Sequence, residues 1–230
     1  KDLNIIRSLF AKSRKFSEFG KCYTGEIDMT FCKAAFTKNP NDIRMIRGAN
    51  LDRYIVKETM SQGETFFLNS DKLNSIKEVG DSLFSESRIV MQGITGVNER
   101  IRLKMTISKN SLCANSVNYC SFKKESNLYL YLGLFNSKLL NYIFKQFSTN
   151  SNVNGYEVDN LPIVLPIPPV IGTLASSIIE AKVIEENADT STLENEIDKQ
   201  VYHLYGLTYD EVLIVDSEAP ITREEYENYS

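Results

Sequence analysis

Residues 135–169 read FNSKLLNYIFKQFSTNSNVNGYEVDNLPIVLPIPP, and three kinds of local structure follow one another within them. Apolar residues recur at helical spacing over 129–147, which predicts a single amphipathic helix there. A polar loop over 148–156 follows, and its Asn154-Gly155 pair is typical of a tight turn. Four prolines, at positions 162, 166, 168 and 169, then close a short strand. We expect this stretch to end a β-rich body.

The residues before this stretch alternate as strands do. Ile27, Met29 and Phe31 share one face of a predicted strand over 25–31. The segment 43–54 predicts a strand that enters a glycine turn at Gly48 and leaves it again. Further strands are predicted over 88–92, 100–106 and 116–121, and a charged helical stretch around 72–79. The first part of the chain is therefore predominantly β.

The residues after the prolines are helical in pattern. A helix is predicted over 171–186, and a second over 193–205, where Thr190-Ser191-Thr192 supplies N-caps and Gly206 suits the position after the last turn. A short helix follows Thr208, and 216–230 predicts a weakly ordered acidic tail. The sequence predicts an α+β fold. Its expected parts are a helical linker (1–19) from a missing upstream domain, a β-rich body (20–168), a helical spacer (169–215) and the tail.

The composition is that of a globular protein without a membrane span. The 230 residues are 42% apolar and 24% charged, and no apolar run approaches the roughly 20 residues that a bilayer requires. Four cysteines without a C-x-x-C pair, and a single histidine, argue against a zinc site and favour reduced thiols in an intracellular protein. The chain begins at Lys1, so we expect a piece of a longer protein, and the reduced cysteines indicate the cytoplasm.

The net charge of −4 conceals two oppositely charged parts. Residues 1–150 hold 23 Lys and Arg against 14 Asp and Glu, a net charge of +9. Residues 151–230 hold 3 against 16, a net charge of −13. A basic body followed by an acidic helical part indicates a polyanionic partner for the body. Charge alone leaves open the alternative that the acidic helices serve solubility.

The sequence contains no recognisable catalytic centre. Asn39-Pro40-Asn41-Asp42 lacks the second proline and the aromatic residue of a methyltransferase tetrapeptide, and is interpreted as a turn. No glycine-rich cofactor loop, no carboxylate cluster for Mg²⁺ and no Cys–His pair is apparent. We therefore expect no cofactor, no metal and no catalytic residue within these 230 residues.

Three groups of side chains are candidates for contact with DNA. Arginine reads guanine, asparagine and glutamine read adenine, and cations follow phosphates. The first group surrounds Gly48, although ion pairs with Asp42 or Asp52 are an alternative for its arginines. The second flanks the glycine loop at 93–98, with 100, 102 and 104 on one strand face as a phosphate track or as a solvated outer face. The third lies in the polar loop, and a basic turn precedes Gly20. In chain order these candidates are Lys12, Arg14, Arg47, Asn50, Arg53, Tyr54, Arg88, Gln92, Asn98, Arg100, Arg102, Lys104, Asn152, Asn154 and Tyr156.

The chain resembles the target recognition domain of restriction-modification DNA methyltransferases, in particular the C-terminal specificity domain of the single-chain type IIG/IIS-like restriction enzymes. The strongest blocks are FNSKLLNY at 135–142 and NVNGYEVDNLPI at 152–163. GEIDMT at 25–30, IRGANLDRY at 46–54, RIVMQGI at 88–94 and LENEIDKQVYHLYGLTYDEV at 193–212 fall in the same order. Each block is short, and their order and spacing carry the resemblance over nearly the whole chain.

The resemblance implies a function and a parent enzyme. It implies that the domain recognises a double-stranded DNA site and positions an upstream methyltransferase domain of the same chain, of the adenine-N6 or a similar type, with or without a nuclease domain. S-adenosylmethionine, and Mg²⁺ for any nuclease, would belong to the parent, where the base is flipped and methylated. Two other hypotheses remain open: a metal-dependent nuclease using Glu64, Asp81 or Glu99, and an interaction module that docks a partner subunit through its acidic helices.

Overall fold

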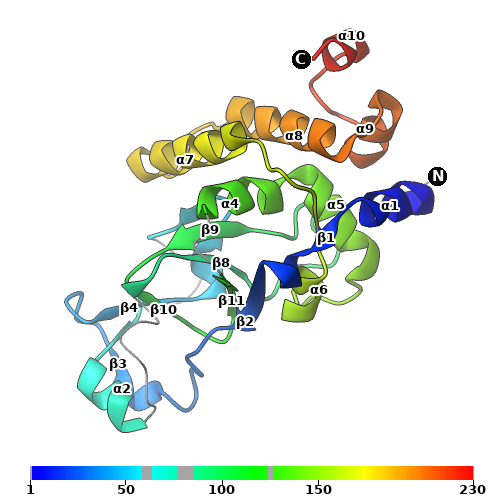
Figure 1. Cartoon of the computed structure of the whole chain (residues 1–230). Helices are drawn as coiled ribbons and strands as arrows, with labels where there is room; N and C mark the ends of the chain where they lie inside the picture. Colours follow the sequence, from blue (N-terminus) through cyan, green and yellow to red (C-terminus); the bar gives the residue numbers. More distant parts are fainter. Residues whose placement is uncertain (1, 59–63, 77–84, 124–126, 230) are drawn as a thin grey trace.

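The structure, a computed structural model, describes residues 2–58, 64–76, 85–123 and 127–229. Helices form two layers over one face of a sheet, and a smaller β-rich lobe lies on the other side (Figure 1). The fold is α+β, as the sequence predicts.

The strands are β1 Arg14–Lys15, β2 Gly20–Thr24, β3 Phe36–Thr37, β4 Ile43–Ile46, β5 Leu51–Asp52, β6 Ile55–Val56, β7 Phe67–Leu68, β8 Arg88–Gln92, β9 Met105–Ser108, β10 Ser111–Cys113, β11 Val117–Phe122 and β12 Pro162–Ile163. The helices are α1 Asp2–Ala11, α2 Ser70–Ile76, α4 Leu128–Asn136, α5 Lys138–Phe147, α6 Gly155–Asp159, α7 Pro169–Ile184, α8 Ser191–Tyr205, α9 Tyr209–Val215 and α10 Arg223–Glu227, with 3-10 turns η1 Phe16–Glu18, η2 Lys33–Ala35 and η3 Gly48–Asn50.

The principal sheet has the order β2-β11-β8-β9 and is antiparallel throughout. Its register places Cys120 between Cys22 and Ile89, and these three side chains join the main core beneath the helices. Val90 and Val117 belong to the opposite face and pack in a separate core with β4, β5 and β10. Because its central strand β8 is covered on both faces, RIVMQ has an apolar interior rather than a simple alternation.

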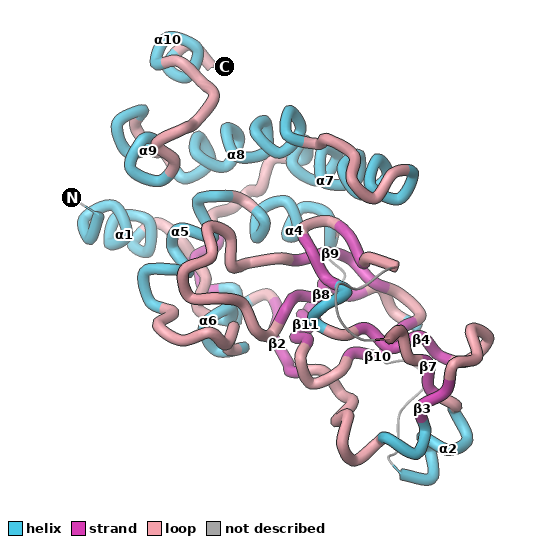
Figure 2. The backbone as a smooth tube through the Cα atoms, turned by 180° about the vertical axis from the view of Figure 1, so that it is seen from behind, coloured by secondary structure: helices cyan, strands magenta, loops and turns pink. Residues whose placement is uncertain are grey.

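The smaller lobe is built on a mixed sheet of order β10-β4-β7-β3, with β10 parallel to β4 (Figure 2). Its own core contains Ile27, Met45, Leu68 and Leu112. The strand predicted over 25–31 does not form. Instead the carboxylate of Asp28 accepts hydrogen bonds from the backbone amides of Thr30 and Phe31, and this local turn replaces a strand ladder.

The helix predicted over 129–147 is two helices, α4 and α5, which meet at Ser137. The backbone of Ser137 is extended there, with ψ at 151°, and its hydroxyl accepts a hydrogen bond from the amide of Leu140. The hydroxyl thus caps the second helix. The apolar spacing continues through the junction, so periodicity did not reveal it. Helix α4 packs against β8 and β9 of the principal sheet and against α7 and α8, while α5 packs against α6, α8 and α9.

Helices α7 and α8 pack on each other and form the outer layer over α4 (Figure 1). Gly206 adopts the left-handed conformation, with φ at 68°, and ends α8 as the sequence predicts. The expectation of a weakly ordered tail is wrong for 217–229. Thr222 and Glu225 form a capping box for α10, and the buried hydroxyl of Tyr226 donates to the carbonyl of Leu207. A buried aromatic anchor therefore orders this acidic segment.

The N-terminal residues pack on the body instead of standing apart from it. Ile5, Leu9 and Phe16 are buried in the main core, and β1 pairs antiparallel with β12. The four cysteines are buried free thiols. Within the described part of the chain, the helices are all too short or too polar to pass through a bilayer.

Candidate functional site

Two buried asparagines from FNSKLLNY hold the segment between β8 and β9. The side chain of Asn141 accepts from the amide of Arg102 at 2.7 Å and donates to the carbonyl of Arg100 at 2.8 Å. The side chain of Asn136 accepts from the amide of Met105 at 3.1 Å and donates to its carbonyl at 2.9 Å. These amides take the place of a neighbouring strand. The predicted strand over 100–106 therefore begins only at Met105.

Arg102 lies inside the protein, with 1% of its surface exposed. Its guanidinium donates to the carbonyl and hydroxyl of Ser148, at 3.1 and 2.9 Å, and to the carbonyl of Asn150 at 2.6 Å. The predicted phosphate track is therefore wrong, because its three cations do not share a strand face. The exposed side chain of Arg100 binds Asp216 and Glu218, and Lys104 binds Glu99 at 2.6 Å.

Arg88 is also buried and does not face a DNA partner. It forms an ion pair with Glu26 at 3.0 Å, donates to the carbonyl of Ser111 and lies over the ring of Tyr119. Desolvation opposes the charged form of Arg88, but Cys113, Glu26 and Tyr119 together raise its pKa. Gln92 donates to the carbonyl of Leu51 at 2.6 Å. The polar residues of β8 thus connect the principal sheet to β10 and to β5.

The group around Gly48 is mostly structural. Asn50 is buried and accepts from the amide of Arg47, while the half-buried Arg47 side chain lies beside the ring of Phe66. Tyr54 is buried with a left-handed backbone, φ 64°, and burial raises its pKa. These placements correct the expectation that Asn50 and Tyr54 are presented to a partner.

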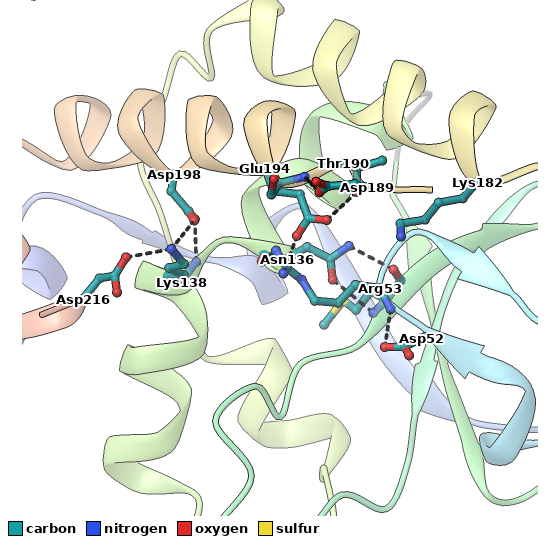
Figure 3. A network of polar contacts seen from close by, with 12 residues as sticks. Asp52, Arg53, Asn136, Lys138, Lys182, Asp189, Thr190, Glu194, Asp198 and Asp216 are labelled. Carbon is teal, nitrogen blue, oxygen red and sulfur yellow. Dashed lines mark hydrogen bonds and ion pairs between the residues drawn. The ribbon is translucent and has the colours of Figure 1, made fainter. Parts of the chain in front are cut away.

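Arg53 and Lys138 connect the β-rich body to the outer helices (Figure 3). Arg53 donates to the carbonyl of Asn136 at 2.7 Å and pairs with Glu194 of α8 at 2.5 Å. Lys138 pairs with Asp216 at 2.7 Å and with Asp198 at 3.6 Å, while its amide donates to Asp198 at 2.7 Å. Burial raises the pKa of Asp198 to about 6, in opposition to these cations. Arg53 is thus engaged in the junction with the helices.

The glycine loop at 93–98 lies beside the polar loop at 148–154. An isolated antiparallel bridge joins Ile94 to Asn152, and the amide of Thr95 donates to the carbonyl of Ser151 at 2.8 Å. Asn98 and Asn152, two of the predicted contacts, are exposed here. Ile94 is exposed too, and the sequence reasoning missed it because an apolar residue in a loop carries no DNA-binding signal. We call 93–98 and 148–154 the paired loops.

The block NVNGYEVDNLPI begins within the paired loops and continues through α6 to β12. Half-buried Asn154 is the N-cap of this helix. Its backbone amide donates to the buried carboxylate of Glu157 at 3.0 Å. Asp159 accepts from the amide of Cys22 at 2.8 Å, which fixes α6 against the edge strand β2. Tyr156 is exposed on α6. Of these predicted contacts, Tyr156 projects outward and Asn154 serves chiefly as a cap.

Exposed cations also occur around β1, on β2 and directly after β11. We call Lys12, Arg14, Lys15, Lys21 and Lys123 the basic strip. Its side chains are exposed, and Arg14 is paired with Glu18 at 2.8 Å. The ammonium of Lys123 donates to the carbonyl of Ser17, which brings β11 and the N-terminal segment together. Arg14 lies over Phe19, and Lys21 lies over Tyr23. Of these cations, Lys12 and Arg14 are the predicted contacts.

Glu64 and Glu99, two acidic residues of the nuclease hypothesis, form ion pairs with different lysines. Glu99 binds Lys104 and accepts from the amide of Gly96, which lowers its pKa, while Glu64 pairs with Lys38. Asp81 lies outside the described residues. Across the described ranges, no group of three or more His, Cys, Asp or Glu side chains is placed to hold a metal ion.

Residues 43–163, more than half of the chain, match the family described as TaqI-like C-terminal specificity domain. The chain belongs to this family. The match runs from β4 to β12 and covers the smaller lobe without β3, the principal sheet without β2, and the paired loops. A comparison with curated proteins finds no match.

The specificity domain is also similar to solved structures. MmeI, a type IIL restriction-modification enzyme determined in complex with DNA, gives a TM-score of 0.50 at 12% identity, over 94% of this chain and 34% of that one. BpuSI, a type IIG restriction endonuclease, gives 0.46 at 12% identity, over 90% and 33%. The HsdS subunit from Thermoanaerobacter tengcongensis gives 0.41 at 9% identity, over 89% and 50%. At this identity MmeI shows the shared fold alone, and the chain spans between a third and a half of these proteins.

Proposed function

We propose that this specificity domain recognises a sequence in double-stranded DNA and positions the catalytic part of a restriction-modification enzyme. The observation that carries the proposal is the family match over 43–163, which contains both the structural asparagines and the paired loops. The similarity in fold to MmeI agrees with it. Because the chain spans only part of such proteins, catalysis is assigned to other domains.

Affinity and specificity come from different surfaces in this proposal. The basic strip supplies cations that are exposed to solvent, and cations on phosphates give affinity that does not depend on sequence. The paired loops supply Asn98 and Asn152, whose amide groups suit base edges, and Tyr156 lies close by in sequence on α6. Arg47 is the half-exposed candidate beside Gly48.

The parent enzyme is inferred to carry an upstream methyltransferase domain acting on adenine-N6 or a similar position, with or without a nuclease domain. S-adenosylmethionine, and Mg²⁺ for cleavage, belong to those domains. The recognition body is assigned to 20–168 and the spacer to 169–215, with 1–19 leading from the upstream domain. Such an enzyme acts on the bacterial chromosome and on incoming DNA, so we infer a cytoplasmic, nucleoid-associated location.

A second candidate is a docking role for the acidic helices. The end of α7 exposes Val183 and Ile184, and this supports a contact between the spacer and the missing catalytic part. Light scattering of the chain mixed with a separately produced methyltransferase domain would detect that complex. A mixture that scatters as two independent species would contradict the docking role.

Selection from a pool of random duplexes tests the proposed function. The 230-residue chain is incubated with the pool at about 50 mM and about 200 mM salt, and the bound fraction is sequenced. We expect binding that weakens with salt and an enriched motif. Binding without a motif would contradict recognition by this domain alone, and no binding at low salt would contradict a DNA partner.

A further inference from the structure

The tip of the loop at 93–98 is apolar and points to solvent. Ile94 is 61% exposed and Val97 is 43% exposed, while Asn98 beside them is also exposed. A single exposed isoleucine is ordinary on a protein surface. This one differs because the loop beneath it is held by backbone pairing with the polar loop and by a buried arginine.

The polar loop holds the tip from one side. The amide of Thr95 donates to the carbonyl of Ser151 at 2.8 Å, and the amide of Val153 donates to the carbonyl of Gly93 at 2.9 Å. These two bonds flank the bridge between Ile94 and Asn152. The tip therefore has the backbone pairing of a short antiparallel ribbon and is not a free loop.

Arg102 holds the tip from inside. Its Nε donates to the hydroxyl of Thr95 at 3.3 Å, and the two other guanidinium nitrogens reach the carbonyls of Ser148 and Asn150. The hydroxyl of Ser148 in turn donates to the buried carboxylate of Glu157 at 3.2 Å. Desolvation lowers the pKa of Arg102, while Glu157 opposes that shift, and a guanidinium stays charged. One buried cation thus orients both members of the paired loops.

We propose that Ile94 is a specificity-determining residue that contacts thymine methyl groups in the major groove, with Val97 beside it, and that Arg102 is the positioning residue for this tip. The inference rests on the proposed function and assigns a chemical partner to it. A phosphate cannot make an apolar contact with an isoleucine side chain. The thymine methyl can, because it is the apolar group on a base-pair edge in the major groove. Asn98 and Asn152 on either side provide the polar groups for neighbouring bases.

The test compares three forms of the 230-residue chain in duplex selection: wild type, Ile94→Ala and Ile76→Ala. Ile76 is the control because it is an isoleucine that is 40% exposed at the end of α2, in the smaller lobe. We expect Ile94→Ala to lose the preference for thymine at one or two adjacent positions and to bind the wild-type site about 5- to 20-fold more weakly. Binding to random duplex, the salt slope and the Ile76→Ala result should stay at wild-type values.

Uracil in place of thymine at the affected position identifies the methyl group. Wild type should lose the same factor on the uracil duplex, and Ile94→Ala should lose nothing further. A wild-type motif that Ile94→Ala retains would overturn this inference and leave the proposed function standing. A loss that uracil does not reproduce would also overturn it, because Ile94 would then act as a wedge between base steps. If the wild-type chain enriched no DNA motif, both the proposed function and this inference would be contradicted.

Thr95→Val tests the positioning role of Arg102 without removing the buried cation. It deletes the hydroxyl that accepts from Nε and keeps the volume of the side chain. We expect partial loss of thymine preference at the position that Ile94→Ala affects and an unchanged salt slope. The chain should still fold, with a lowered unfolding midpoint because the buried Nε loses its acceptor. Equal weakening on all duplexes would show a general structural role and would overturn the assignment to Arg102.

Discussion

The segment 93–106 and the basic strip are both rich in cations, but the fold uses those cations in opposite ways. In the first, Arg102 lies inside and donates to loop carbonyls. In the second, Lys12, Lys15 and Lys21 are exposed. The planar guanidinium has five donors and can satisfy several carbonyls at once, whereas the ammonium is strongly hydrated and stays in water. Positive charge in this sequence therefore marks two roles, internal support and outward contact.

The sharpest way to break this comparison is to exchange the two neighbouring arginines for neutral residues. Arg102→Met should reduce the free energy of unfolding by about 4 kcal/mol, because several buried carbonyls lose their donor. Arg100→Ala, two residues away, should change it by less than about 0.5 kcal/mol, because the Arg100 side chain is exposed and Asp216 keeps its ion pair with Lys138. Urea unfolding of both variants measures the difference. Equal effects would contradict the division into internal and external cations.

The asparagine supports of the same segment give the next largest effect. Asn141→Ala removes the partner of the Arg102 amide, the Leu103 amide and the Arg100 carbonyl, and should cost about 3 kcal/mol. Gln146→Ala, at an exposed position on the same helix, is the matched control and should be within about 0.5 kcal/mol of wild type. Thermal unfolding followed by circular dichroism tests both. An equally stable Asn141→Ala would mean that water replaces the amide.

The stability that the junction with the outer helices contributes should depend on pH. The pKa of Asp198 in the folded chain is raised to about 6, above the value of an unfolded aspartate, so its ionisation destabilises the fold as pH rises through 6. The free energy of unfolding of Asp198→Asn should therefore rise by about 2 kcal/mol relative to that of wild type between pH 4 and pH 7.5. Unfolding free energies of both proteins at matched pH give the difference. A constant difference across this range would exclude a raised pKa.

The basic strip should affect binding and leave stability alone. Replacing Lys12, Lys15 and Lys21 by Ala should weaken binding to random duplex about tenfold and flatten the salt slope by about 0.9 for each lysine on a phosphate. Lys33, Lys38 and Lys109 are exposed on or beside the smaller lobe, and their triple replacement is the control. Fluorescence anisotropy at several salt concentrations measures both. Equal slopes for the two triple variants would remove the strip from the proposed interface.

Periodicity predicted the elements that bury one continuous apolar face. The strand at 88–92, the helices on either side of Asp189 and the glycine at 206 are confirmed, because each depends on local spacing or on a capping residue. The break at Ser137 was missed because the apolar spacing runs through it. The strand predicted over 25–31 was wrong, since a local turn at Asp28 competes with pairing to another strand.

The candidate site was predictable in class and only partly in its residues. Arginine and asparagine are the right types for DNA contact, yet the same donors and acceptors satisfy buried carbonyls and amides. Arg88, Arg102 and Asn50 are used internally, while Asn98 and Asn152 face outward. Residue type could not separate these two groups, because burial depends on partners that are distant in the chain.

The sequence by itself determined the α+β class, the charge division between body and spacer, and the ordered blocks by which the family is recognised. These features depend on composition and on contacts between near neighbours in the chain. Only the tertiary structure decided which cations are buried, and that Asn141 and Arg102 support loops about 40 to 50 positions away in the chain. A hydrogen bond across such a separation leaves no local pattern, because either partner alone is an ordinary polar residue.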